Sequence, residues 1–171
     1  MKKITKKALV IAIIAGILVI LDGILSKVLN QTGSFTWVAF VSWTVFFGST
    51  IKERLKAVVG YVIGFLLAVA IIYLGNWLDF IPFGIFGVAV GSILATMIVN
   101  FLCIELEIFE KYFPISISGI FVGIAMTFSG LGVGLSVNTL ESSLVMLAII
   151  VIYGILGLLS GWATLKFGME K

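Results

Sequence analysis

Apolar residues occur along this chain in long continuous runs separated by short polar stretches. A helix needs roughly 20 apolar residues to cross a bilayer core. Six runs come close to that length, although the second is short and the fourth can start a little later: Ala8–Leu29, Phe35–Ile51, Ala57–Leu78, Ile81–Ile104, Ile115–Val137 and Leu144–Phe167. The runs do not alternate with polar residues as barrel strands do. The pattern predicts an all-α membrane protein with six transmembrane helices, forming one domain over residues 1–171.

Composition agrees with a lipid environment. The 171 residues are 61% hydrophobic and 11% charged, whereas a soluble domain has about a quarter charged residues. The basic residues lie at the ends of apolar runs and form no stripe for nucleic acid. We therefore expect the lipid bilayer, and no nucleic acid, as a partner.

The N-terminal lysines before the first apolar run resemble the start of a signal peptide. The run from Ala8 to Leu29 is longer than the roughly 7–15 residues of a signal-peptide core, and no Ala-x-Ala-like cleavage site ends it. We interpret it as a retained transmembrane helix.

The distribution of positive charge predicts the orientation. With the N-terminus in the cytoplasm, the outer segments contain one basic residue, Lys27, and the inner segments contain the other ten of the 11. This positive-inside bias predicts a multi-pass protein of the bacterial inner membrane with both termini cytoplasmic.

The six predicted helices divide into two sets of three, over residues 8–78 and 81–167. Because three is odd, a duplication would give an inverted repeat. The second and fifth helices support this 3+3 arrangement, since Phe40 and Phe47 in one match Phe121 and Phe128 in the other.

Glycines spaced along the third, fourth and sixth helices predict close helix packing, because glycine lets two backbones approach. The same faces are compatible with a homo-oligomer. The glycines are Gly60, Gly64, Gly84, Gly87, Gly91, Gly154, Gly157 and Gly161.

Asp22 lies well inside the first predicted helix. An intramembrane carboxylate indicates a functional site by default. Alternatively, Asp22 lies near the outer interface and hydrogen-bonds Ser26 or reaches Lys27 through water.

The second and fifth helices contain the other candidates for a solute path. Aromatic rings on either side of a few hydroxyl groups suit a narrow path for a small, weakly polar solute, although such rings also commonly pack or face lipid. The path candidates are Asp22, Phe40, Ser42, Trp43, Thr44, Phe47, Phe121, Thr127 and Phe128. The glycine-rich stretch over residues 129–134 predicts either a loop or a solute-binding bend.

Residue types for catalysis are scarce. The chain has no histidine and one cysteine, Cys103. Neither an acid–base pair nor a metal site can be assembled within the predicted helices. We expect no enzyme activity, no metal and no cofactor.

The fifth helix contains Gly119-x-Phe121-x-Gly123-x-x-x-Thr127-Phe128-x-Gly130. Through this motif, and through its size and six-span pattern, the chain resembles a bacterial inner-membrane family, domain of unknown function 1097. The resemblance implies a membrane protein but no activity. The chain departs from the family pattern in its longer basic N-terminus and in Asp22, so the resemblance implies no role for Asp22.

These observations favour a small channel or secondary transporter for a small neutral or weakly charged solute, with its path near the second and fifth helices. The alternative is a non-transporting membrane subunit or scaffold that binds a partner through its glycine-rich helix faces.

Overall fold

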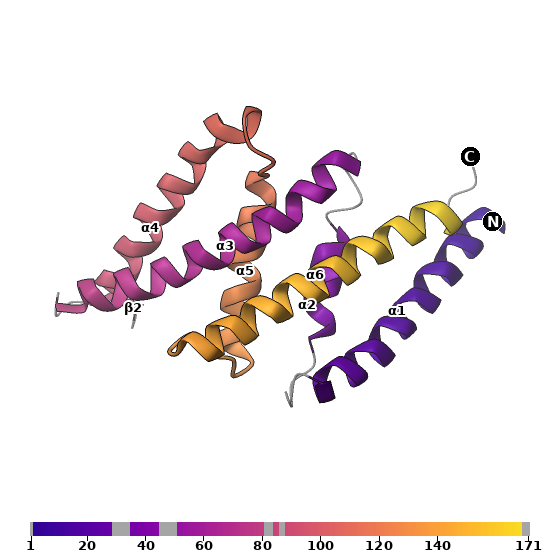
Figure 1. The fold of residues 1–171 in the computed structure, drawn as a ribbon, viewed down its shortest axis with the longest axis horizontal. Helices are drawn as coiled ribbons and strands as arrows, with labels where there is room; N and C mark the ends of the chain where they lie inside the picture. Colours follow the sequence, from indigo (N-terminus) through magenta and orange to yellow (C-terminus); the bar gives the residue numbers. More distant parts are fainter. Residues whose placement is uncertain (1, 29–34, 45–50, 81–83, 86–87, 169–171) are drawn as a thin grey trace.

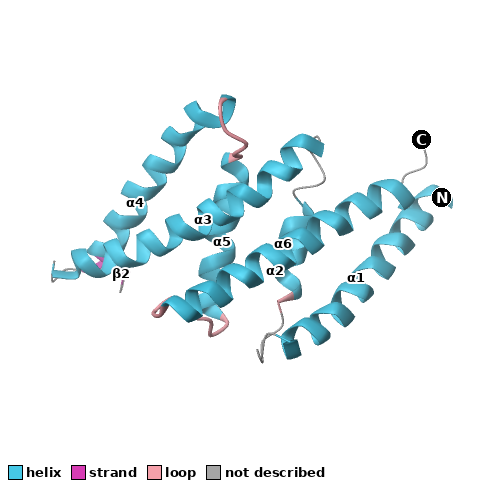
Figure 2. Cartoon of the chain, viewed as in Figure 1, coloured by secondary structure: helices cyan, strands magenta, loops and turns pink. Residues whose placement is uncertain are grey.

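The chain folds into helices connected by short segments (Figure 1), and the computed structural model describes residues 2–28, 35–44, 51–80, 84–85 and 88–168. The α-helices are α1 (Lys2–Val28), α2 (Thr36–Thr44), α3 (Ile51–Trp77), α4 (Val90–Glu105), α5 (Ile117–Gly132) and α6 (Leu140–Gly168). Two short 3-10 helices, η2 (Leu78–Phe80) and η3 (Leu106–Lys111), follow α3 and α4. The described part is therefore almost entirely helical (Figure 2).

Each predicted run overlaps one of these helices, but the fourth helix starts later than its run. Two antiparallel two-residue strands, β1 (Gly84–Ile85) and β2 (Val88–Ala89), precede α4. Gly84 thus lies in a strand and not on a helix face, and Gly87 lies outside the described residues. The sequence explains the late start, because Pro82, Gly84 and Gly87 all disfavour a helix within six residues.

Two of the described helices are long and apolar enough to cross a membrane. These segments are Lys56–Phe80, within α3 and η2, and Leu140–Phe167, within α6. Helices α4 and α5 are apolar but have only 16 residues each, which corresponds to about 24 Å at 1.5 Å per residue.

The helices form two groups, each built around one long helix. Helix α3 packs against α4 and α5, and we call these three helices the α3 bundle. Helix α6 packs against α1 and α2, and we call these the α6 bundle. Figure 1 shows the α3 bundle on the left and the α6 bundle on the right, with α3 and α6 in contact between them.

Glycines bring α3 and α5 very close together. A Cβ atom at Gly60 would lie 2.8 Å from the backbone carbon of Gly119, and one at Gly64 would collide with the backbone of Ile120 and Gly123. Since these neighbours are backbone atoms, they cannot rotate away as a side chain can. The α3–α5 crossing therefore requires residues without side chains on both helices.

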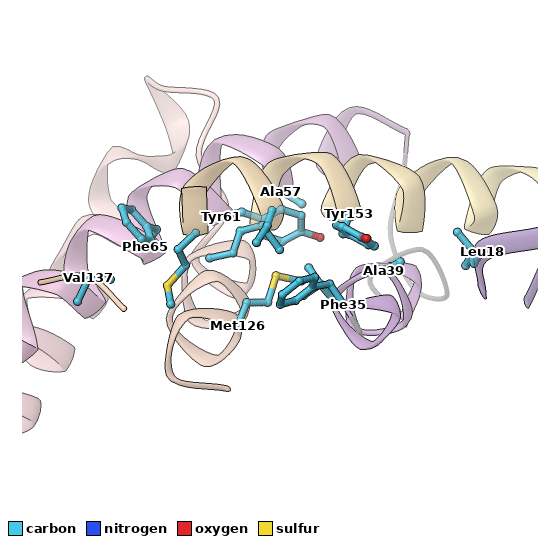
Figure 3. Close-up of a cluster of buried hydrophobic side chains, with 13 residues drawn as sticks. Leu18, Phe35, Ala39, Ala57, Tyr61, Phe65, Met126, Val137 and Tyr153 are labelled. Carbon is cyan, nitrogen blue, oxygen red and sulfur yellow. The ribbon is translucent and has the colours of Figure 1, made fainter. Parts of the chain in front are cut away.

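Two clusters of buried apolar side chains fill the interior. One joins residues of α3, α4 and α5 only, including Ala68, Val99 and Ile124. The other extends from Leu18 in α1 across both bundles to Phe65 in α3 (Figure 3). The second cluster therefore contains the boundary between the α3 bundle and the α6 bundle.

Candidate functional site

A buried hydroxyl group, Ser42 near the end of α2, links three helices at this boundary. Its Oγ atom donates to the backbone carbonyl oxygen of Gly154 in α6 at 2.6 Å and lies 2.8 Å from the hydroxyl oxygen of Tyr61 in α3. A serine hydroxyl has a single hydrogen. Because Ser42 uses that hydrogen for Gly154, Tyr61 must be the donor to Ser42. We call Ser42, Tyr61 and Gly154 the hydroxyl junction.

Tyr61 is the central residue of the junction, because it contacts α2, α5 and α6. Its hydroxyl reaches α2, and its ring covers Gly154, where a Cβ atom would lie 2.9 Å from the ring. Its backbone oxygen would lie 2.5 Å from a Cβ atom at Gly123 in α5. Tyr61 is completely buried among the apolar side chains of the larger cluster (Figure 3).

The three other buried serine and threonine hydroxyl groups in the described chain behave differently. Thr127, Ser160 and Thr164 each donate to the carbonyl oxygen four residues earlier in their own helix, at 2.8–2.9 Å. Such bonds satisfy the hydroxyl locally and do not connect helices. The Ser42 hydroxyl is thus the one among these four that joins α2 to α3 and α6.

The predicted path residues divide between buried and exposed faces. Ser42 and Thr127 are fully buried. Phe40, Phe121 and Phe128 are 39%, 38% and 40% exposed, so these three rings lie on the outside of the described chain. The three rings are therefore less buried than the two hydroxyl groups.

The remaining path candidates lie where side chains are not described. Asp22 is in α1, and Trp43 and Thr44 are the last two residues of α2. Phe47 lies outside the described residues.

A separate cavity of about 310 Å³ lies where α5 connects to α6. Helix α5 continues to Gly132, and Gly134 then turns the chain with a φ of 93°, a conformation that favours glycine. Ser136, Thr139, Glu141 and Ser142 line the cavity, together with three apolar or glycine residues. Thr139 and Ser142 hydrogen-bond each other at the start of α6, so their hydroxyl groups already have partners.

Comparison with known families supplies an identification. The model of the family described as protein of unknown function (DUF1097) matches residues 8–167, which is nearly the whole chain. The chain belongs to this family. No curated protein and no solved structure matches it.

For this DUF1097 chain, membership confirms the resemblance seen in the α5 motif and brings no activity with it. The motif residues Gly119 and Gly123 lie at the α3–α5 crossing. Sequence reasoning missed Tyr61, although it singled out the glycines on either side. A tyrosine between Gly60 and Gly64 in an apolar run was the available signal, since a buried tyrosine hydroxyl usually needs a partner.

Proposed function

We propose that this chain is a six-span protein of the bacterial inner membrane that acts as a small channel or secondary transporter for a small neutral or weakly charged solute. In this proposal its two halves form a 3+3 inverted repeat, both termini are cytoplasmic, and the path runs near α2 and α5. The observation that carries the proposal is the hydroxyl junction, a buried polar contact at the boundary of two helix bundles.

The helix contacts support the inverted repeat. In such a repeat α1 corresponds to α4, α2 to α5, and α3 to α6. With this correspondence, the α3–α5 contact of one half is equivalent to the α6–α2 contact of the other. The same correspondence makes the α3–α4 contact equivalent to the α6–α1 contact and maps the α3–α6 and α2–α5 contacts onto themselves. Such a pattern is expected for two similar halves related by a two-fold axis.

Burial along α2 and α5 agrees with the same correspondence. Pairing Phe40 with Phe121 places Ser42 opposite Gly123, and both members of this second pair are buried. The two phenylalanines are almost equally exposed. The repeat suggested by the matching phenylalanines is therefore supported by the burial of the residues around them as well.

The bundle boundary is a suitable place for a transport cycle. In many transporters with inverted repeats, one bundle rocks against the other around a site near the membrane centre. Here Tyr61 of the α3 bundle donates a hydrogen bond to Ser42 of the α6 bundle. Movement of one bundle against the other would break this bond and expose two hydroxyl groups to a passing solute.

The alternative scaffold hypothesis rests on eight glycines, of which Gly84 and Gly87 lie where burial is not described. Gly60, Gly64, Gly91, Gly154, Gly157 and Gly161 are all buried within the chain. A partner would have to use a different surface, so transport remains the better proposal.

A flux assay in proteoliposomes tests the proposal. We would measure entry of urea, glycerol, acetate and methylamine and compare the native chain with Tyr61→Phe. One hydrogen bond is worth about 0.5–1.5 kcal/mol, so we expect flux of the transported solute to change by roughly two- to tenfold. The matched control is Thr164→Val, which also removes one buried hydroxyl but leaves the bundle boundary intact, and we expect it to have native flux. Flux no higher than in protein-free liposomes for every solute would reject the proposal.

A further inference from the structure

Lysines gather at one end of the α6 bundle, where the first and last helices meet. Helix α1 starts at Lys2 and contains Lys3, Lys6 and Lys7 in its first two turns. Helix α6 packs against α1 and contains Lys166 in its last turn. Figure 1 shows the start of α1 beside the end of α6. Segments from opposite ends of the sequence thus place five lysine positions at one end of the α6 bundle.

The four lysines of α1 share one side of their helix. At 100° per residue, the positions of Lys2, Lys3, Lys6 and Lys7 fall within an arc of about 140°. This spacing, with pairs four residues apart, places the four positions on one face of the helix.

The sequence contains few carboxylates that could balance this charge. The first acidic residue of the chain is Asp22, about five turns away along α1, at 3.6 residues per turn. After Glu141 the next carboxylate is Glu170, which follows Lys166 by four residues and lies outside the described residues. Five lysines therefore face one glutamate in these two segments. The basic stretch at the start of α3 differs, because Glu53 lies between Lys52 and Arg54.

Two exposed aromatic rings accompany the lysine of α6. The Nζ atom of Lys166 lies 4.6 Å from the centroid of the Trp162 ring and 5.5 Å from that of Phe167. The two rings meet edge to face at 6.3 Å. Trp162 and Phe167 are 43% and 55% exposed. Tryptophan beside lysine is typical of the level where acyl chains meet headgroups.

We propose that the start of α1 and the end of α6 form a binding site for an anionic phospholipid headgroup. The lysines Lys2, Lys3, Lys6, Lys7 and Lys166 would neutralise the headgroup phosphate, while Trp162 and Phe167 would contact the upper acyl chain. Juxtamembrane clusters of four or more basic residues bind anionic lipid in this way. The inference requires membrane insertion but not transport, so either proposal can fail alone.

Thermal unfolding in a neutral detergent tests this site. Phosphatidylglycerol should raise the melting temperature of the native chain at lower concentration than phosphatidylcholine with the same acyl chains. Each lysine near an anionic surface contributes about 1 kcal/mol, so changing Lys2, Lys3, Lys6 and Lys7 together to Gln should raise the half-saturating phosphatidylglycerol concentration at least about tenfold. The same change to Arg should preserve binding, since it preserves charge.

Matched variants separate this site from charge attraction in general. Changing Lys52, Arg54 and Lys56 to Gln removes three positive charges at the start of α3 and should alter the half-saturating concentration by less than about twofold, because these side chains lie outside the proposed site. Lys166→Gln alone should raise it about fivefold, and it remains informative if the fourfold variant does not fold.

Two outcomes would overturn the inference. The first is that the folded lysine-to-glutamine variants bind phosphatidylglycerol as tightly as the native chain does. The second is that the variant at the start of α3 loses as much phosphatidylglycerol binding as they do. Inorganic phosphate and glycerol phosphate distinguish a lipid site from a site for free phosphate. If either raised the melting temperature as effectively as phosphatidylglycerol, the ligand would be the free anion and the lipid assignment would be wrong.

Discussion

At the scale of single residues, the Ser42–Tyr61 bond is the most informative contact in the described chain. It joins helices from two bundles, whereas Thr127, Ser160 and Thr164 each bond to their own helix. Hydrogen bonds between membrane helices contribute on average about 0.6 kcal/mol, with a maximum near 1.7 kcal/mol. The bond is therefore strong enough to favour one arrangement of the bundles and weak enough to break in the proposed transport cycle.

A double-mutant cycle measures this contact directly. Ser42→Ala and Tyr61→Phe each remove one side of the bond, and we expect a coupling energy of about 0.5–1.5 kcal/mol between them. The measurement is reversible unfolding of the four variants by a denaturing detergent in mixed micelles.

The control cycle combines Tyr61→Phe with Thr164→Val. Because Thr164 bonds to Ser160 in its own helix, the two effects should add within about 0.3–0.5 kcal/mol. Additive effects of Ser42→Ala and Tyr61→Phe would show that the hydroxyl junction contributes no stability as a unit.

At the scale of helices, the α3–α5 crossing depends on the absence of side chains. Gly64→Ala would place a methyl group against the backbone of Ile120 and Gly123. Overpacking of this kind costs about 1–3 kcal/mol, so we expect a clear loss of stability when melting temperatures are compared in the same detergent.

Gly16→Ala in α1 is the matched substitution, because nothing lies within 4 Å of the added methyl group. Alanine is the better helix former by about 1 kcal/mol, so this variant should be as stable as the native chain or more stable. Equal stability of Gly64→Ala and the native chain would contradict the observed crossing.

Helix limits show how far the sequence pattern alone predicts the fold. The apolar runs located each of the long helices, because burial in lipid and burial in a bundle both select apolar residues. They did not locate the helix ends. Helix α6 begins at Leu140 instead of Leu144, since Thr139 and Ser142 cap it with reciprocal backbone–side-chain bonds. Helix α3 begins at Ile51 and includes charged residues that favour helix without being apolar.

The candidate site was less predictable than the fold, for a geometric reason. Glycine spacing indicates that a helix face packs closely, but it does not indicate which helix packs there. Ser42 was recognised as a hydroxyl within an apolar helix. Its partner Tyr61 is set by the crossing of three helices, and no local pattern along the chain contains that information.

At the scale of the whole molecule, the fold is organised by contacts between the first three helices, α1–α3, and the last three, α4–α6. Helices α3 and α6 each pack on all three helices of the other half, so neither half has a complete core by itself. In the proposed transport cycle the bundles would move against each other at the boundary near Tyr61, because backbone contacts at glycines hold α3 and α5 together within the α3 bundle.

The arrangement in a membrane leads to a prediction for the two sides of the bilayer. Tyr112, after η3, and Asn138, between α5 and α6, are both exposed, and α5 separates them. In the proposed orientation Asn138 faces outward and Tyr112 faces the cytoplasm, because the inner segments contain ten of the 11 basic residues.

In a Cys103→Ala background, Asn138→Cys should react with a membrane-impermeant maleimide in intact cells, and Tyr112→Cys should react only after lysis. The cysteine-free chain controls for background labelling. Reaction of both positions from the same side would mean that α5 does not cross the bilayer, and the six-span arrangement would then be wrong.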